Sequence, residues 1–194
     1  MAKPEIDRER KVIVVPATIK LKAFRGGEPP HHHLLTWKGG RAGKKALLVT
    51  PASDTAILDA LEALGGEPGD NLEAEAWSER DDPHDPRPDV QAKGPLLTVT
   101  VVLADGTRHD VGKLLDDPDG KGIEWRLAGN RALIKVWKSG CVCCLQSCPG
   151  SKIANARYTM RDHYHERSRF APSKLAEEIG EGAQLKVEIG FGGR

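Results

Sequence analysis

The chain lacks several features that would place it in a functional class at once. It has no run of about 18 apolar residues, which is the length that a membrane-spanning helix needs. Its first ten residues are charged where a secretory signal would carry an apolar segment, so we expect either a cytoplasmic protein or an exported one whose leader has been removed. The formal net charge of +1 shows no basic excess, which argues against nucleic acid as a partner.

No familiar catalytic motif is present. The sequence contains no G-x-S-x-G elbow, no phosphate-binding P-loop, no G-x-G-x-x-G after a strand and no H-E-x-x-H. The glycine-rich stretch 65–69 follows a predicted helix, whereas phosphate binds at the beginning of a helix, so we interpret this stretch as a stop and turn. These absences favour an electron carrier or a binding protein over a catalyst.

Cysteine is scarce, and all four cysteines fall within eight residues. Disulfide frameworks join distant segments, so such bunching points to local chelation. The stretch C-x2-C-x3-C-P, with Cys141, Cys144 and Cys148, reproduces the last three cysteines and the proline of the ferredoxin run C-x2-C-x2-C-x3-C-P, while Lys138 stands in place of the first cysteine. A helical turn of the chain would bring positions three and four residues apart to one side, so we expect these three thiols to converge on an iron–sulfur cluster, suspected to be [4Fe–4S]. Cys143 should point away, because adjacent side chains face in different directions.

Other occupants of the cysteine loop remain open, namely zinc or another single ion, a disulfide, or free thiols. His163 and His165 follow the loop and are candidates for the missing ligand, although a solvated polar face is the simpler interpretation of both. His31 and His33 could share a metal from alternate positions of a strand, and a polar strand entry is again the simpler interpretation.

The predicted function is therefore an iron–sulfur electron-transfer or redox accessory protein with an unidentified redox protein as its partner. The alternative is a non-enzymatic structural or binding module whose cysteine loop holds zinc or a disulfide. A thiol–disulfide protein using Cys141 and Cys144 is the least favoured, because such motifs normally begin a helix in a βαβ unit.

Alternating or β-branched segments dominate the chain and predict strands within residues 11–22, 31–37, 45–50, 96–103, 107–114, 123–127, 132–137 and 184–191. Segments 31–37 and 45–50 should form a hairpin, and the cysteine loop should follow the strand 132–137. Ser53 is a candidate N-cap for a helix that ends at Gly65-Gly66. We expect one α+β, β-rich domain over residues 1–194, with a mainly antiparallel sheet, one main α-helix packed on it, and an exposed acidic, proline-rich loop at about 73–94.

The stretch G-C-x-x-C-L-x-S-C-P at 140–149, followed by N-A-x-Y-T at 155–159, resembles the bacterial YdjY domain family. Segments in the family's order also occur at 45–49, 60–71, 105–106 and 129–130, so the resemblance runs from about Lys11 to the C-terminal strand. It implies a ferredoxin-like or 4Fe–4S protein with ligands at Cys141, Cys144 and Cys148, and an apolar residue where Cys143 stands. It implies no particular reaction.

Overall fold

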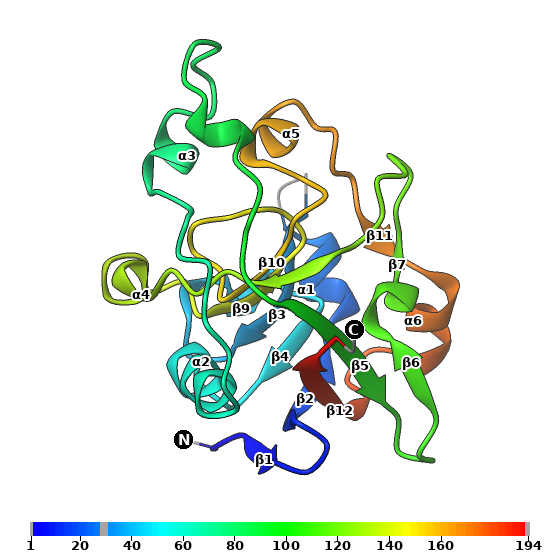
Figure 1. The fold of residues 1–194 in the computed structure, drawn as a ribbon. Helices are drawn as coiled ribbons and strands as arrows, with labels where there is room; N and C mark the ends of the chain where they lie inside the picture. Colours follow the sequence, from blue (N-terminus) through cyan, green and yellow to red (C-terminus); the bar gives the residue numbers. More distant parts are fainter. Residues whose placement is uncertain (1, 28–30, 193–194) are drawn as a thin grey trace.

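The structure is a computed structural model that describes residues 2–27 and 31–192, and its elements are drawn in Figure 1. The strands are β1 (Glu5–Asp7), β2 (Val12–Ile19), β3 (His33–Trp37), β4 (Leu48–Thr50), β5 (Leu96–Val102), β6 (Arg108–Asp110), β7 (Leu115–Asp116), β8 (Trp125–Leu127), β9 (Cys141–Cys144), β10 (Ile153–Asn155), β11 (Ala171–Pro172) and β12 (Gln184–Phe191). The α-helices are α1 (Leu21–Arg25), α2 (Asp54–Ala63), α3 (Glu75–Ser78), α4 (Arg131–Trp137), α5 (Met160–Tyr164) and α6 (Lys174–Ile179). None of these helices is long and apolar enough to cross a membrane. Short 3-10 helices cover Arg41–Lys44, Arg87–Asp89 and Val111–Leu114.

Eight strands form a closed barrel. They follow one another in the order β2, β12, β5, β8, β10, β9, β3 and β4, and β4 pairs back onto β2 through Thr18 with Val49 and Ile19 with Leu48. The pairs β3–β4 and β9–β10 are parallel, and the other pairs in the ring are antiparallel. β1 and β6 extend the sheet outside the ring, while β7 and β11 pair separately.

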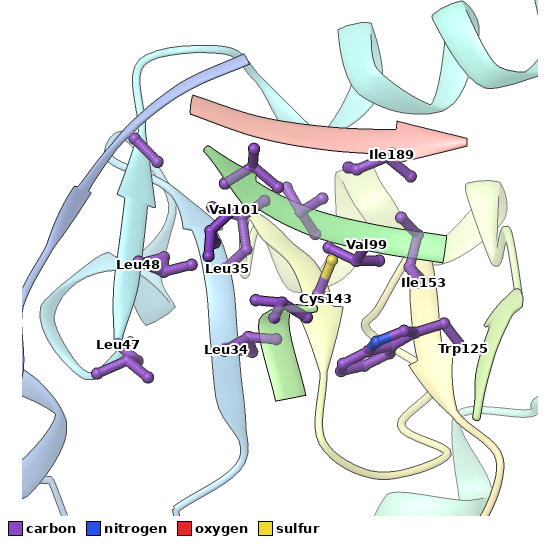
Figure 2. Close-up of a cluster of buried hydrophobic side chains, with 14 of the residues drawn as sticks. Leu34, Leu35, Leu47, Leu48, Val99, Val101, Trp125, Cys143, Ile153 and Ile189 are labelled. Carbon is purple, nitrogen blue, oxygen red and sulfur yellow. The ribbon is translucent and has the colours of Figure 1, made fainter. Parts of the chain in front are cut away.

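The core fills the barrel with alternate residues of the long strands. In β2 the buried apolar positions are Ile13, Val15, Ala17 and Ile19, two residues apart, as a strand with one buried face requires. Neighbouring strands contribute in the same way, and Figure 2 shows Val99 and Val101 of β5 near Ile189 of β12. This alternation is what the sequence pattern predicted.

The predicted fold class, an α+β, β-rich domain with a mainly antiparallel sheet and one main helix packed on it, was wrong. The sheet closes on itself, and the helices are small, with α2 spanning only ten residues. Alternation cannot distinguish the two cases, because a strand buries one face whether a helix or the opposite wall of a barrel covers that face. Closure depends on pairing between β2 and β4, whose partner residues lie about thirty positions apart and share no local signal.

Local predictions had mixed outcomes. The helix after Ser53 is confirmed, since α2 begins at Asp54 and the Ser53 side chain accepts a hydrogen bond from the Ala56 backbone N–H at 3.1 Å. The hairpin of 31–37 with 45–50 was wrong, because β3 and β4 run parallel. The strand at 132–137 was also wrong: α4 forms there, with Val136 left 69% exposed to solvent. Its β-branched residues imitate a strand, but no residue of α4 is buried.

The acidic segment 73–94 has an exposed tip at 81–84 and anchored flanks. Ala76 and Ala92 are buried, and α3 and a 3-10 helix interrupt the loop. Arg161 of α5 secures the tip, because its guanidinium donates hydrogen bonds to the backbone carbonyls of Arg80 at 3.2 Å, Asp82 at 2.5 Å and Asp85. This segment therefore packs over α5 and the end of the cysteine strand.

Candidate thiol site

Cys141 and Cys144 enter the site from β9, an internal strand between β3 and β10, and Cys148 follows in the loop after it. In a regular strand Cys141 and Cys144, three residues apart, would face opposite sides. However, Cys141 and Cys143 lie opposite consecutive residues of β3, so Val142 is an extra residue in β9. Such a bulge redirects the side chains around it. The irregular register thus allows Cys141 and Cys144 to reach the same side.

Three of the four thiols share one small buried cluster. Cys141, Cys144 and Cys148 pack together with Ala76 of α3 and Met160 of α5, and none of the three cysteines is more than 5% exposed. All are free thiols. The structure therefore brings together the three residues that the C-x2-C-x3-C spacing singled out, by means of a bulged strand and the loop after it rather than a helical turn.

Cys143 lies apart from this cluster. It is fully buried in the main core of the barrel, and Figure 2 shows its sulfur near Val99 with Leu34 below it. Cys143 therefore behaves as a small apolar residue of the barrel interior.

A buried and hydrogen-bonded loop holds the thiols in place. Every residue from Gly140 to Ala156 is buried. The Ser147 hydroxyl accepts from the Ala92 backbone N–H at 2.9 Å, and the Ser151 hydroxyl donates to the Cys148 carbonyl at 2.7 Å. Gly140, just before β9, adopts a φ of +68°, and a Cβ there would meet the Cα of Gly40 at 2.6 Å. The entry to the strand is thus restricted to glycine.

Hydrogen bonding, with some help from nearby charge, favours a thiolate at one of the cysteines. The Cys144 thiol, by hydrogen bonding, lowers the pKa of Cys141 to about 5, and nearby His33 and Lys152 add to this against the opposing effect of burial. Burial raises the pKa of Cys144, which lies between Cys141 and Cys148. Lys152 is itself buried, with its Nζ 3.4 Å from an Asp54 carboxylate oxygen and 2.9 Å from the Gly150 carbonyl. Cys141 is therefore the thiol of this set best suited to carry negative charge.

A cavity of about 770 Å³, which we call the front pocket, opens in front of the thiols. Cys141 and Cys148 lie in its wall. The described residues that line it are Gly27, His31, His32, His33, Arg41, Ala42, Lys45, Ala74, Trp77, Ser78, Arg80, Val136, Trp137, Ser139, Cys141, Cys148, Gly150 and His163. The pocket thus combines soft donors, imidazoles, cations and aromatic rings in one space.

The histidine candidates divide between pocket and surface. His31 and His33 line the front pocket, and so does His163, whose pKa is lowered to about 4 mainly by burial, with Arg80 and His33 adding to the effect. His165 is exposed, does not line the pocket, and packs against Tyr164 with ring centres 5.2 Å apart. Of the two histidines proposed as a fourth ligand, the structure therefore places only His163 near the thiols.

Several residues of the site were not predicted from the sequence. Trp77 and Arg80 come from the acidic segment, and Trp137 comes from a helix predicted as a strand. Lys152 is buried whereas Lys135, before the cysteine loop, is exposed, and no local sequence pattern distinguishes these two lysines. The sequence offered only a weak signal for these pocket residues, namely a tryptophan, Trp77 or Trp137, in each of two otherwise polar or short segments.

The arrangement falls short of a formed metal site. Within residues 2–27 and 31–192, no group of three or more His, Cys, Asp and Glu side chains is positioned to hold a metal ion. The three thiols nevertheless provide the soft donors that zinc, Cu(I) and iron–sulfur clusters prefer. Donor chemistry thus suits such groups, while the placement of the side chains as it stands does not.

Comparison with known proteins identifies relatives. A family model described as the YdjY domain matches residues 5–188. A protein of Escherichia coli (strain K12) named "Uncharacterized protein YdjY" is 29% identical over 128 residues, which cover 66% of this chain and 52% of that protein. The chain therefore spans about half the length of this relative. No solved structure matches the chain.

Proposed function

The chain belongs to the YdjY domain family, and we propose that it is a redox accessory protein whose working centre is formed by the thiols of Cys141, Cys144 and Cys148. The finer proposal is that these thiols hold an iron–sulfur cluster. One observation carries both: three free thiols share a buried cluster, two of them in the wall of a pocket, while the fourth lies in the barrel core. Bound there, an iron–sulfur cluster supplies one-electron exchange with a redox partner.

The thiols must be reoriented before they can hold a cluster. Because the described side chains do not form a ligand set as they stand, loading requires cysteine side chains to turn toward the front pocket. Cys141 and Cys148 already line that pocket, whereas Cys144 lies behind them in the buried cluster. Rotation about a single side-chain bond moves a cysteine sulfur between staggered positions without moving the backbone.

Residues around the thiols compensate negative charge and shield the cluster from water. Lys152 provides a buried positive charge near Cys141, which offsets the negative charge of a thiolate. Trp77 and Trp137 pack against the thiol cluster and exclude water from part of it. A centre that is shielded and partly charge-compensated is suited to electron exchange, because its potential is set by surrounding charges and solvent exposure.

Anaerobic purification followed by iron, zinc and acid-labile sulfide analysis tests the proposal. We expect a brown protein that absorbs near 400 nm and contains iron and sulfide together. A colourless protein with one zinc per chain would contradict the iron–sulfur proposal and support a zinc-bound module. A metal-free protein with four titratable thiols would contradict both, and would leave the thiols themselves as the reactive groups.

A further inference from the structure

The front pocket has the size of a small-molecule site. Its volume of about 770 Å³ falls within the range of roughly 300–1,000 Å³ that is usual for ligand pockets. Such pockets combine apolar surface with a few polar groups that fix the orientation of the ligand. The chemistry of the lining therefore indicates the class of ligand that would fit.

Apart from the Cys141 thiol, whose lowered pKa favours a thiolate, the charged side chains of the pocket have one sign. They are Arg41, Lys45 and Arg80, and none of the described lining residues is an aspartate or glutamate. The ion pairs that the structure shows between described residues include none of these three cations. Unpaired cations around a concave surface attract an anion.

Aromatic rings form a continuous wall of the same pocket. Trp137 and Trp77 meet edge to face with ring centres 6.4 Å apart, Trp77 lies 5.5 Å from His163, and His163 lies 4.8 Å from His32. The Arg80 guanidinium lies over the Trp77 ring at 4.7 Å. Such a wall offers ring faces and edges to a flat apolar body.

Two buried polar atoms at the pocket have no hydrogen-bond partner in the part of the chain that the structure describes. The Nδ1 atoms of His33 and His163 are both buried and make no hydrogen bond among the described residues. Buried polar groups normally find a partner, so unpaired ones call for a specific explanation. Polar atoms of a ligand in the pocket would provide it.

From these three observations we propose that the front pocket binds a planar aromatic anion, that is, a ring system carrying a carboxylate, sulfonate or phosphate group. The ring packs on Trp77 and Trp137, and the anionic group lies toward Arg41 and Lys45. This inference goes beyond the proposed function, and the ligand would share the front pocket with any group that the thiols hold. A simple inorganic oxyanion would use the cations but leave the aromatic wall without a role.

Calorimetric titration with naphthalene-2-sulfonate tests the inference, with neutral naphthalene-2-methanol and inorganic sulfate as comparison probes. We expect the sulfonate to bind at least tenfold more tightly than either probe. Arg41 and Lys45 are exposed and have no ion-pair partner among the described residues, so the R41Q/K45Q variant should keep its fold. This variant should bind the sulfonate about tenfold more weakly, as expected for two partly solvated charge contacts.

The matched control is K93Q/K186Q, which removes two exposed lysines away from the pocket lining. This control should bind as the unmodified protein does. Equal binding of the sulfonate and the neutral probe, or equal loss in both variants, would overturn the anion site. If sulfate bound as tightly as the sulfonate, the proposal that an aromatic ring packs on the tryptophans would be overturned. Iron and sulfide should be measured on the same samples. The cluster content of each sample is then known, so the outcome of the ligand titration can be distinguished from the outcome of the test of the thiol centre.

Discussion

Arg161 should decide whether the acidic segment stays closed over the thiols. Its side chain is buried, and its guanidinium holds three backbone carbonyls of the segment, those of Arg80, Asp82 and Asp85. It also lies 3.3 Å from a carboxylate oxygen of Asp89. Glutamine in place of Arg161 cannot span these acceptors, because it lacks both the charge and the forked donor geometry.

The loss of unfolding free energy in R161Q can be estimated from these contacts. A hydrogen bond from a charged donor contributes about 1.5–3 kcal/mol, so three give an upper bound of roughly 5–9 kcal/mol. The freed carbonyls can rehydrate, since Asp82 is exposed and the segment can detach locally. The ion pair adds below about 1 kcal/mol, because the Asp89 side chain is 58% exposed. We therefore expect R161Q to reduce the free energy of unfolding by about 2–4 kcal/mol.

Urea denaturation and limited proteolysis of R161Q measure the global and local effects. Cleavage within 73–94 should become faster, and the cluster thiols should react sooner with a thiol reagent. The control is R157Q, since Arg157 is exposed and its one ion pair among the described residues is with the carboxylate of Glu124 at 2.9 Å; it should change stability by less than about 1 kcal/mol. Equal stability and equal cleavage rates in R161Q and R157Q would refute this role for Arg161.

Two further changes probe buried and pH-dependent charge. K152M should lower the free energy of unfolding by about 3–5 kcal/mol, because it leaves the Asp54 carboxylate buried without its partner; K152M/D54N should recover part of this in urea denaturation, and no recovery would contradict the pairing. Hydrogen bonding by Arg108, and then Arg10, lowers the pKa of Glu188 from its ordinary 4.5 to about 2, so its stabilisation is present above pH 4.5 and is lost as pH falls toward 2. E188Q should therefore be less stable than the unmodified protein by about 1–2 kcal/mol at pH 6, discounted for the half-exposed arginines, and the difference should shrink as pH falls and vanish below pH 2; a difference independent of pH would contradict this.

The thiol grouping could be anticipated from spacing, although by the wrong route. The sequence interpretation brought Cys141, Cys144 and Cys148 together through a helical turn. In the structure an extra residue, Val142, changes the alternation of β9. A bulge depends on how two strands pair, so the sequence of β9 alone could not reveal it. Cys143 was separated from the others because adjacent side chains diverge, and that argument applies to a strand as well as to a helix.

The front pocket could not be anticipated, because it is built from segments far apart in the chain. Trp77 and Arg80 reach it from a segment whose prolines and acidic residues suggested only a surface loop. Trp137 reaches it because α4 forms between two residues with left-handed backbone, Asn130 and Lys138. Single-sequence patterns report local periodicity and report nothing about which distant loops meet.

The most direct test of the central claim compares two adjacent cysteines. Cys143 and Cys144 are both fully buried, so serine at either position carries a similar cost of placing a hydroxyl in an apolar environment. Iron and acid-labile sulfide per chain should be measured in anaerobically purified C143S and C144S beside the unmodified protein. The account predicts that C143S retains both and that C144S loses both. Loss in C143S with retention in C144S, or identical contents in the two variants, would contradict it.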